Sequence, residues 1–170
     1  TVTGANTYTG GTAVSGGMAL GPRRFGLAKL GTSFRCMTDC GNDFLSSVDL
    51  QVIDQSLPKQ TVVIHASYDH GVKLDGINPL SLGESSGLHG YSNSAFLGAR
   101  RALFNVEDRI FFVDDLFHVV SLGAAAFFDS GFAWPEDAAP ALKHAVGAGL
   151  RIAFSRSSRN EPLKLDLAYA

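Results

Sequence analysis

Residues 120–131 read VSLGAAAFFDSG, and the pattern of this stretch decides the expected fold. Side chains of a β-strand alternate between its two faces. One face of such a strand would be apolar and unbroken, formed by Val120, Leu122, Ala124, Ala126 and Phe128. The opposite face would carry small or polar residues, namely Ser121, Gly123, Ala125 and Asp129. This alternation predicts a strand with two chemically different faces.

The same alternation recurs along the chain, whereas helical periodicity with caps is weak. Strands are expected near 7–20, 22–35, 43–55, 60–70, 101–111, 144–155 and 162–170. The sequence therefore predicts an all-β, antiparallel fold of about eight strands. The expected short connections contain GPRR, LPKQ, VDDL and SSRNEP, and the longer ones lie near 36–42, 71–98 and 132–143.

Connections that are short at one end and long at the other are typical of a transmembrane β-barrel of the outer membrane. The soluble alternative is a two-sheet sandwich. Long apolar faces opposite small or singly charged residues favour the barrel, and Phe132 and Trp134 stand at a strand end where an aromatic girdle would lie. Strands in lipid cannot leave edge N–H and C=O groups unpaired, so these strands either close on themselves or pair with further strands.

Composition supports one domain that is globular or membrane-embedded. The chain has 170 residues, 45% of them hydrophobic, and a net charge of -2, which argues against disorder and against nucleic acid as a partner. The longest apolar stretch, near 117–128, is shorter than the roughly 20 residues of a transmembrane helix. No signal peptide pattern follows Thr1, so a mature chain or a fragment is expected.

Two cysteines, Cys36 and Cys40, lie in the sequence RCMTDCGND. They are too few for a structural zinc site, which takes four ligands. A short disulfide is favoured over two free thiols if the compartment is oxidising.

Two motifs are compatible with chemistry at a site, but both are better explained as loop or lining residues. Ser85 is central in GESSG, yet the nucleophile elbow requires a buried strand before the serine and a helix after it. His65, Asp69 and His70 lie in HASYDHG; His65 and Asp69 would share a strand face about 13 Å apart, too far to bind one ion. We therefore expect no enzyme activity, no metal and no cofactor.

The segment 71–98 is much longer than an ordinary connection, and such loops are usually functional or disordered. It contains Leu88, Tyr91 and Phe96, so it has apolar groups to bury. Gly90 allows a tight turn between His89 and Tyr91. We expect this loop to fold against another part of the protein.

Five segments between about Leu82 and Ala170 form a specific pattern: GLHGY, ARRALFNVEDRIFF, VSLGAAAFFDSGFAW, VGAGLRIAFSRSS and LKLDLAYA. In these segments the chain resembles the C-terminal barrel region of the Omp85 superfamily, which includes bacterial surface antigen D15 and BamA-like and TamA-like proteins. In this family an Arg-Gly-Phe/Tyr cluster of the sixth extracellular loop folds into the barrel lumen and meets an aspartate. The matching residues here are His89, Gly90 and Tyr91, with Leu88 beside them; Phe127, Asp129 and Gly131; and Gly147, Gly149, Leu150 and Arg151.

His89 departs from the family, which has arginine at this position. An arginine forms a bidentate pair with a carboxylate that does not depend on pH, and a histidine cannot. The resemblance therefore implies that His89 pairs with Asp129 in a weaker contact that depends on pH.

The resemblance also implies a function and a location. The chain would supply about the eighth to fifteenth strands of a sixteen-stranded barrel in the bacterial outer membrane, with the POTRA domains and the last strand outside these residues. Such barrels insert outer-membrane proteins or export partner proteins. The expected partners are outer-membrane lipid, client or secreted protein chains and accessory lipoproteins. Two alternatives stay open: a barrel that anchors a fused patatin-like hydrolase, which upstream sequence would reveal, and a self-contained eight-stranded structural barrel, which a terminal strand with a C-terminal aromatic would exclude.

Overall fold

The computed structural model describes residues 8–36, 44–72, 79–116, 120–134, 139, 141–154 and 163–170. Eight strands form one antiparallel sheet in the order β1-β2-β3-β4-β7-β8-β9-β10. These strands are β1 (Tyr8–Gly21), β2 (Arg24–Cys36), β3 (Phe44–Asp54), β4 (Gln60–Val72), β7 (Arg100–Leu116), β8 (Val120–Trp134), β9 (Lys143–Phe154) and β10 (Leu163–Tyr169). The predicted all-β antiparallel fold and its eight strands are confirmed.

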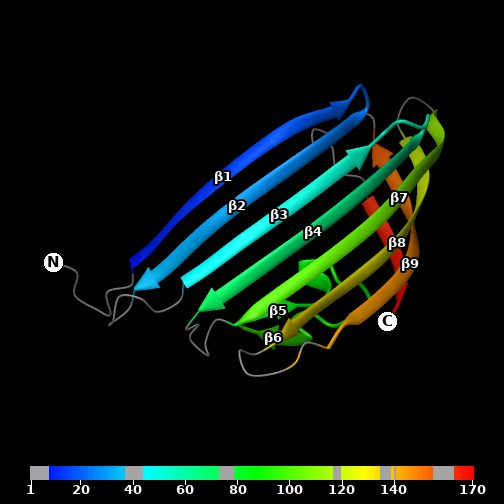
Figure 1. Ribbon diagram of the computed structural model, residues 1–170. Helices are drawn as coiled ribbons and strands as arrows, with labels where there is room; N and C mark the ends of the chain where they lie inside the picture. Colours follow the sequence, from blue (N-terminus) through cyan, green and yellow to red (C-terminus); the bar gives the residue numbers. More distant parts are fainter. Residues whose placement is uncertain are drawn as a thin grey trace.

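Neighbouring strands of the large sheet follow one another in the sequence, except that other described elements lie between β4 and β7. The connection between β4 and β7 contains β5 (Leu80–Leu82), the short 3-10 helix η1 (Glu84–Ser86) and β6 (Phe96–Gly98). β5 and β6 pair with each other as a separate two-stranded sheet. Figure 1 shows them at the end of the large sheet where β4 ends and β7 begins.

The described strands do not close into a barrel. β1 and β10 are the two edges of the sheet, and each is paired on one side only within the described part of the chain. Figure 1 shows a broad sheet that curves from β7 to β9, with its two edges apart. The self-contained, closed eight-stranded barrel is therefore not the arrangement seen.

The two faces of the sheet differ as the alternation predicts. We call the face that carries Asn105, Asp129 and Arg151 the inner face, and the opposite face the outer face. Along β8, outer Phe128 is 39% exposed while its neighbour Asp129 is 1% exposed. Along β9, outer Leu150 is 53% exposed and Arg151 only 2%. Along β8 and β9, large apolar side chains thus face outward, and charged side chains are buried on the inner face.

Among the described residues, no helix has the length and apolar character needed to cross a membrane.

Candidate functional site

The loop between β4 and β7 packs on the inner face through a small apolar cluster. Leu82 and Leu88 are completely buried, and both pack with Leu103 of β7. Gly131 of β8 leaves room for them: a Cβ there would lie 3.2 Å from side-chain carbons of Leu82 and Leu103, and 2.9 Å from the Ala102 carbonyl oxygen. The expectation that this loop folds against the protein is confirmed for its described residues.

Tyr91 provides a further contact at the loop tip. Its hydroxyl donates a hydrogen bond to the His144 carbonyl oxygen at 3.1 Å. Its ring meets the Phe96 ring edge-on, with 5.2 Å between centroids. Gly90, just before it, has φ +80°, in the left-handed region that glycine adopts without strain.

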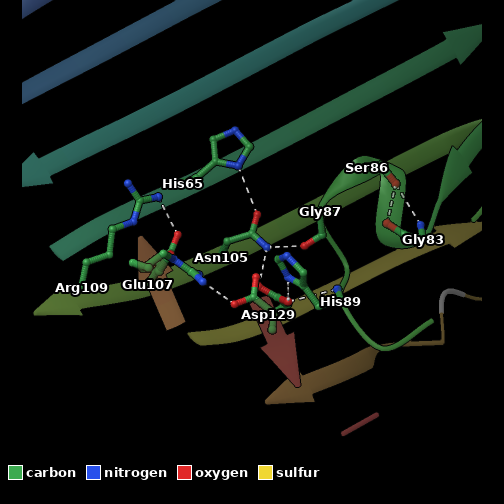
Figure 2. Close-up of polar contacts among 11 residues, drawn as sticks. His65, Gly83, Ser86, Gly87, His89, Asn105, Glu107, Arg109 and Asp129 are labelled. Atoms are coloured by element: carbon green, nitrogen blue, oxygen red, sulfur yellow. Dashed lines mark hydrogen bonds and ion pairs between the residues drawn. The ribbon is translucent and has the colours of Figure 1, made fainter. Parts of the chain in front are cut away.

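The polar contact of the loop is centred on Asp129. Its Oδ2 accepts the backbone N–H of His89 at 3.1 Å and faces the Nδ1 of His89 at 2.7 Å. Its Oδ1 accepts a hydrogen bond from the Asn105 Nδ2 at 2.6 Å, and that same nitrogen donates to the Gly87 carbonyl oxygen at 2.7 Å. Figure 2 shows these four residues converging from the loop, β7 and β8. We call Gly87, His89, Asn105 and Asp129 the loop-docking network.

The surroundings of His89 favour its charged form. The hydrogen bond to Asp129 raises the pKa of the ring above 6.5, burial works against this, and the charges of Asp129, Asp166 and Glu107 add to the increase. The ring also lies beside that of Phe127, with 4.6 Å between centroids. His89 and Asp129 thus form the pair that the resemblance implied.

Arg151 belongs to a second, neighbouring cluster. Its guanidinium bonds Glu107 Oε1 through Nη2 at 2.6 Å and Nε at 3.1 Å, and it pairs with Asp166 through Nη1. Arg109 Nη2 lies 2.6 Å from the other oxygen of Glu107. Within the described residues, the side-chain bonds of Arg151 thus join β7, β9 and β10 rather than reaching the loop.

The two glycines before Arg151 make room for large neighbours. Gly149 is opposite Asp166 in the register, and a Cβ at Gly149 would collide with the Asp166 carboxylate and with the Leu165 carbonyl. Gly147 is opposite Phe127, and a Cβ there would collide with the Phe127 ring and with a backbone carbonyl of β10. The ring that contacts His89 therefore occupies the space above Gly147.

A third polar contact was not foreseen from the sequence. Arg101 bonds Asp69 Oδ2 through Nε at 2.9 Å and Nη2 at 2.6 Å, and its Nη1 donates to the Ser81 carbonyl oxygen at 2.8 Å. Asn105 was equally missed as a partner of the loop. Within the predicted strand 101–111, alternation separates Arg101 and Asn105 from the apolar residues Ala102 and Phe104. The sequence therefore indicates the face on which these two side chains lie, but not the residues that they contact.

His65, Asp69 and Ser85 of the two weighed motifs line one cavity of about 620 Å³ on the inner face, but they contact different partners. His65 contacts Asp49 and Asn105, while Asp69 contacts Arg101. Ser85 lies in the three-residue helix η1, after a three-residue strand, and its backbone N–H donates to Asn93 Oδ1 at 3.1 Å. In the described ranges, no group of three or more His, Cys, Asp or Glu is arranged to hold a metal ion.

The predicted disulfide stays a prediction. Cys36 is the last residue of β2, and its side chain and Cys40 lie outside what the structure describes. Phe132 and Trp134 lie together at the end of β8, with ring centroids 4.7 Å apart, as expected of two aromatic residues at a strand end.

Comparison of this chain with protein-family models, with curated proteins and with solved structures finds no match. The family therefore stays a prediction that rests on the motifs in the sequence.

Proposed function

We propose that this chain is part of an Omp85-type barrel in the bacterial outer membrane, which inserts proteins into that membrane or exports proteins across it. The observation that carries the proposal is the docking of the loop tip: Leu88 is buried on the inner face and His89 Nδ1 lies 2.7 Å from Asp129. These residues are the ones that match the family's loop and its lumen aspartate. The match is read from the residue pattern, and the contact is read from the arrangement of the loop and the strands.

The exposed apolar face supports placement in lipid. A sheet in water usually turns its apolar face to a core and its polar face to solvent. Here large apolar side chains such as Phe104, Ile110 and Leu165 are exposed on the outer face, while the ion pairs of Asp69 and Arg151 lie on the inner one. The strands β3, β4, β7, β8 and β9 have 11 to 17 residues, enough for the roughly 9–11 that cross a bilayer.

The two sheet edges support a barrel completed by further strands. An edge strand in lipid would leave N–H and C=O groups without partners, at a cost of several kcal/mol each. β1 and β10 both present such edges in the described part of the chain. In the proposed barrel both edges pair with strands that these residues do not supply.

The proposed activity makes and breaks no covalent bond. Its client would be an unfolded or secreted polypeptide, and the working parts would be strand pairing at an edge and the docked loop on the inner face. A loop that occupies the lumen restricts what enters it, so its docking is expected to influence activity.

Reconstitution of the intact protein in liposomes tests this function. In the first assay, an unfolded outer-membrane protein is added outside the liposomes, and its folding is followed by the gel shift of the folded barrel. A second assay follows the entry of a secreted protein into the interior of the liposomes. We expect one of the two rates to exceed that of liposomes holding an unrelated barrel. Asp129→Ala should lower that rate, whereas Glu84→Gln, which changes a residue exposed on the same loop, should leave it unchanged. Failure to accelerate either process would contradict the proposed function.

A further inference from the structure

The connection between β4 and β7 contains a compact segment, residues 83–95, whose two ends meet. A Cβ at Gly83 would collide with the Ser92 carbonyl oxygen and would lie 3.2 Å from the Ala95 amide nitrogen. The flanking strands β5 and β6 pair with each other, so they bring these ends together. A short loop with closed ends that packs on itself is an Ω-loop. We call residues 83–95 the lid, and the β5–β6 ribbon that carries it the stalk.

Hydrogen bonds inside the lid give it a shape of its own. The Gly83 carbonyl oxygen accepts the backbone N–H of Ser86 at 3.1 Å and that of Leu88 at 3.0 Å. Figure 2 shows the hydroxyl of Ser86 bonded back to Gly83, whose N–H it accepts at 2.8 Å. The Ser85 N–H donates to Asn93 Oδ1 at 3.1 Å and ties the first half of the lid to the second. None of these bonds needs a residue outside the lid, so they can persist when the lid leaves the sheet.

The stalk is fixed to the large sheet by an anchor of its own, Arg101 of β7. Two nitrogens of its guanidinium bond the buried Asp69 of β4 at 2.9 and 2.6 Å, and the third donates to the Ser81 carbonyl oxygen of β5 at 2.8 Å. On the other strand of the stalk, a Cβ at Gly98 would collide with the Trp134 backbone of β8. The planar fork of arginine makes such a pair with a carboxylate directional and strong. The stalk is thus held by contacts in which no lid residue takes part.

The lid is held at a different place on the inner face. Its polar contacts are those of the loop-docking network, in which Gly87 bonds Asn105 and His89 bonds Asp129. These polar contacts involve no stalk residue. The completely buried Leu88 is the point where lid and stalk share the apolar cluster described above. The connection therefore has two separate polar anchors, one for the stalk and one for the lid.

The lid also borders two cavities on the inner face. Ser85 and Ser86 line one of about 620 Å³, and Gly87 and His89 line another of about 250 Å³. His65 of β4 borders both, so the two cavities are neighbours. A lid that leaves the sheet removes a wall from each cavity. Release of the lid alone would therefore join them into one space over β3, β4 and β7.

We propose that the lid undocks from the inner face as one body while the stalk stays in place, and that this motion joins the two cavities. Leu88 then leaves the apolar cluster, and the bonds of the lid to Asn105 and Asp129 break. The bonds within the lid remain, as does the bond from Arg101 to Ser81. The inference depends on contacts within this chain and not on insertion or export of proteins.

Pulsed EPR distances between spin labels in the intact protein test this inference. All variants carry Cys36→Ser and Cys40→Ser, so that labels attach only to new cysteines. One label replaces Leu57, which is 58% exposed in the turn before β4, at the end of the sheet away from the stalk. The second replaces either Ser92 of the lid or Leu97 of the stalk, both exposed. The 13 residues of β4 put these pairs on the order of 40 Å apart, which this method measures.

The two anchors predict different results for the two label pairs. Asp129→Ala releases the lid, so the lid distance should lengthen or broaden beyond its wild-type width while the stalk distance stays unchanged. Arg101→Gln releases the stalk, which carries the lid, so both distances should broaden. Glu84→Gln changes an exposed lid residue and is the matched control; it should leave both distances at their wild-type values.

A third label pair, at Glu84 and Ser92, tests whether the lid moves as one body. Both positions are exposed and lie within the lid, so their short separation is read by continuous-wave EPR. In Asp129→Ala this separation should equal that of wild type. A separation that spreads out would show that the segment unfolds on release, and would overturn the proposal.

Three results with the first two pairs would also overturn it: a stalk that moves with the lid in Asp129→Ala, a lid that keeps its wild-type distance there, or a stalk unaffected by Arg101→Gln. Heat-modifiability on gels reports whether each variant folds. Where one does not, His89→Gln replaces Asp129→Ala and Arg101→Lys replaces Arg101→Gln, because these changes remove only part of each anchor. The same pattern of distances is expected from them.

Discussion

Asp129 shows how a single buried carboxylate organises the site. It is almost fully buried, yet three hydrogen bonds reach it, from the ring and the backbone of His89 and from Asn105. A buried charge is tolerated when it is paired and hydrogen-bonded in this way. Removing one partner therefore costs more than the contact itself, because the buried group that remains has neither its partner nor water to bond with.

The His89 contact should weaken at alkaline pH. The folded-state pKa of His89 is raised above 6.5, so its favourable charge is fully present below that value and is lost as pH rises through the raised pKa. Protease cleavage within residues 80–95 of wild type should therefore increase with pH. His89→Arg keeps its charge and should remove this increase, and Asp129→Ala should be cleaved readily at every pH. Identical, pH-independent cleavage of wild type and Asp129→Ala would show that the pair does not hold the loop.

Gly147 should tolerate no side chain. Gly147→Ala places a methyl group against the Phe127 ring and a backbone carbonyl of β10, which cannot move freely, so we expect a loss of about 1–3 kcal/mol in the free energy of unfolding. Gly16→Ala on β1 is the matched control, because its methyl group would meet no atom within 4 Å; it should change stability by less than about 0.5 kcal/mol. Urea unfolding measures both. Equal stability of the two variants would contradict the packing of Phe127 over Gly147.

At the scale of the element, strands such as β8 and β9 expose their apolar face and bury their polar face, which is the opposite of a typical strand in a soluble protein. β8 and β9 pair so that the exposed apolar residues of each lie on one face, while Asp129 and Arg151 lie on the other. Glycine, alanine and serine on the inner face leave room for the loop and for long charged side chains. Along β8 and β9, where apolar and polar residues alternate most regularly, the outer face carries no Asp, Glu, Lys or Arg among the described residues.

Leu150→Arg should distinguish lipid from water around the outer face. In a bilayer this change puts a charge in hydrocarbon and should destabilise by about 2–4 kcal/mol near the midplane. In water the same exposed position would tolerate arginine within about 0.5 kcal/mol. Leu122→Arg should behave like Leu150→Arg, and Ala125→Ser on the inner face should be mild. Heat-modifiability on gels reports folding, and equal tolerance at Leu122 and Ala125 would contradict a membrane-spanning sheet.

At the scale of the whole molecule, the strands alternate in direction, so their connections divide between two ends. Residues 22–23, 55–59, 117–119 and 155–162 connect strands at one end, and 37–43, 73–99 and 135–142 connect them at the other. The predicted grouping of these connections at two ends is confirmed, but the length division holds only in part: 155–162, which was expected to be short, is as long as 135–142 and longer than 37–43. In the proposed barrel, the end with the longer connections faces the outside of the cell.

Thiol labelling of intact cells tests this orientation. Cys36 and Cys40 flank the beginning of a connection at the outer end, and a disulfide between them would block labelling until a reductant is added. Labelling without a reductant would show that the disulfide is absent. Labelling only after the outer membrane is permeabilised would show that the orientation is inverted.

Much of the fold was determined by the sequence itself, because strand alternation is a local property. Phe128 and Asp129, or Leu150 and Arg151, are adjacent residues, and their assignment to opposite faces needs only an extended backbone. The expected strand ranges are confirmed to within a few residues at most ends; β7 is longer, since it extends from Arg100 to Leu116. The pairing of His89 with Asp129 was anticipated only through the family resemblance, not through alternation.

The partners of the inner-face residues were decided by the tertiary structure alone. Which residue lies beside Asn105 depends on the register of three strands and on where the loop returns to the sheet; His65 is 40 positions away in the chain and Gly87 is 18. Arg151 likewise meets Glu107 across 44 positions. Alternation states which face a side chain occupies, but only pairing between distant strands determines what it touches and whether the sheet closes.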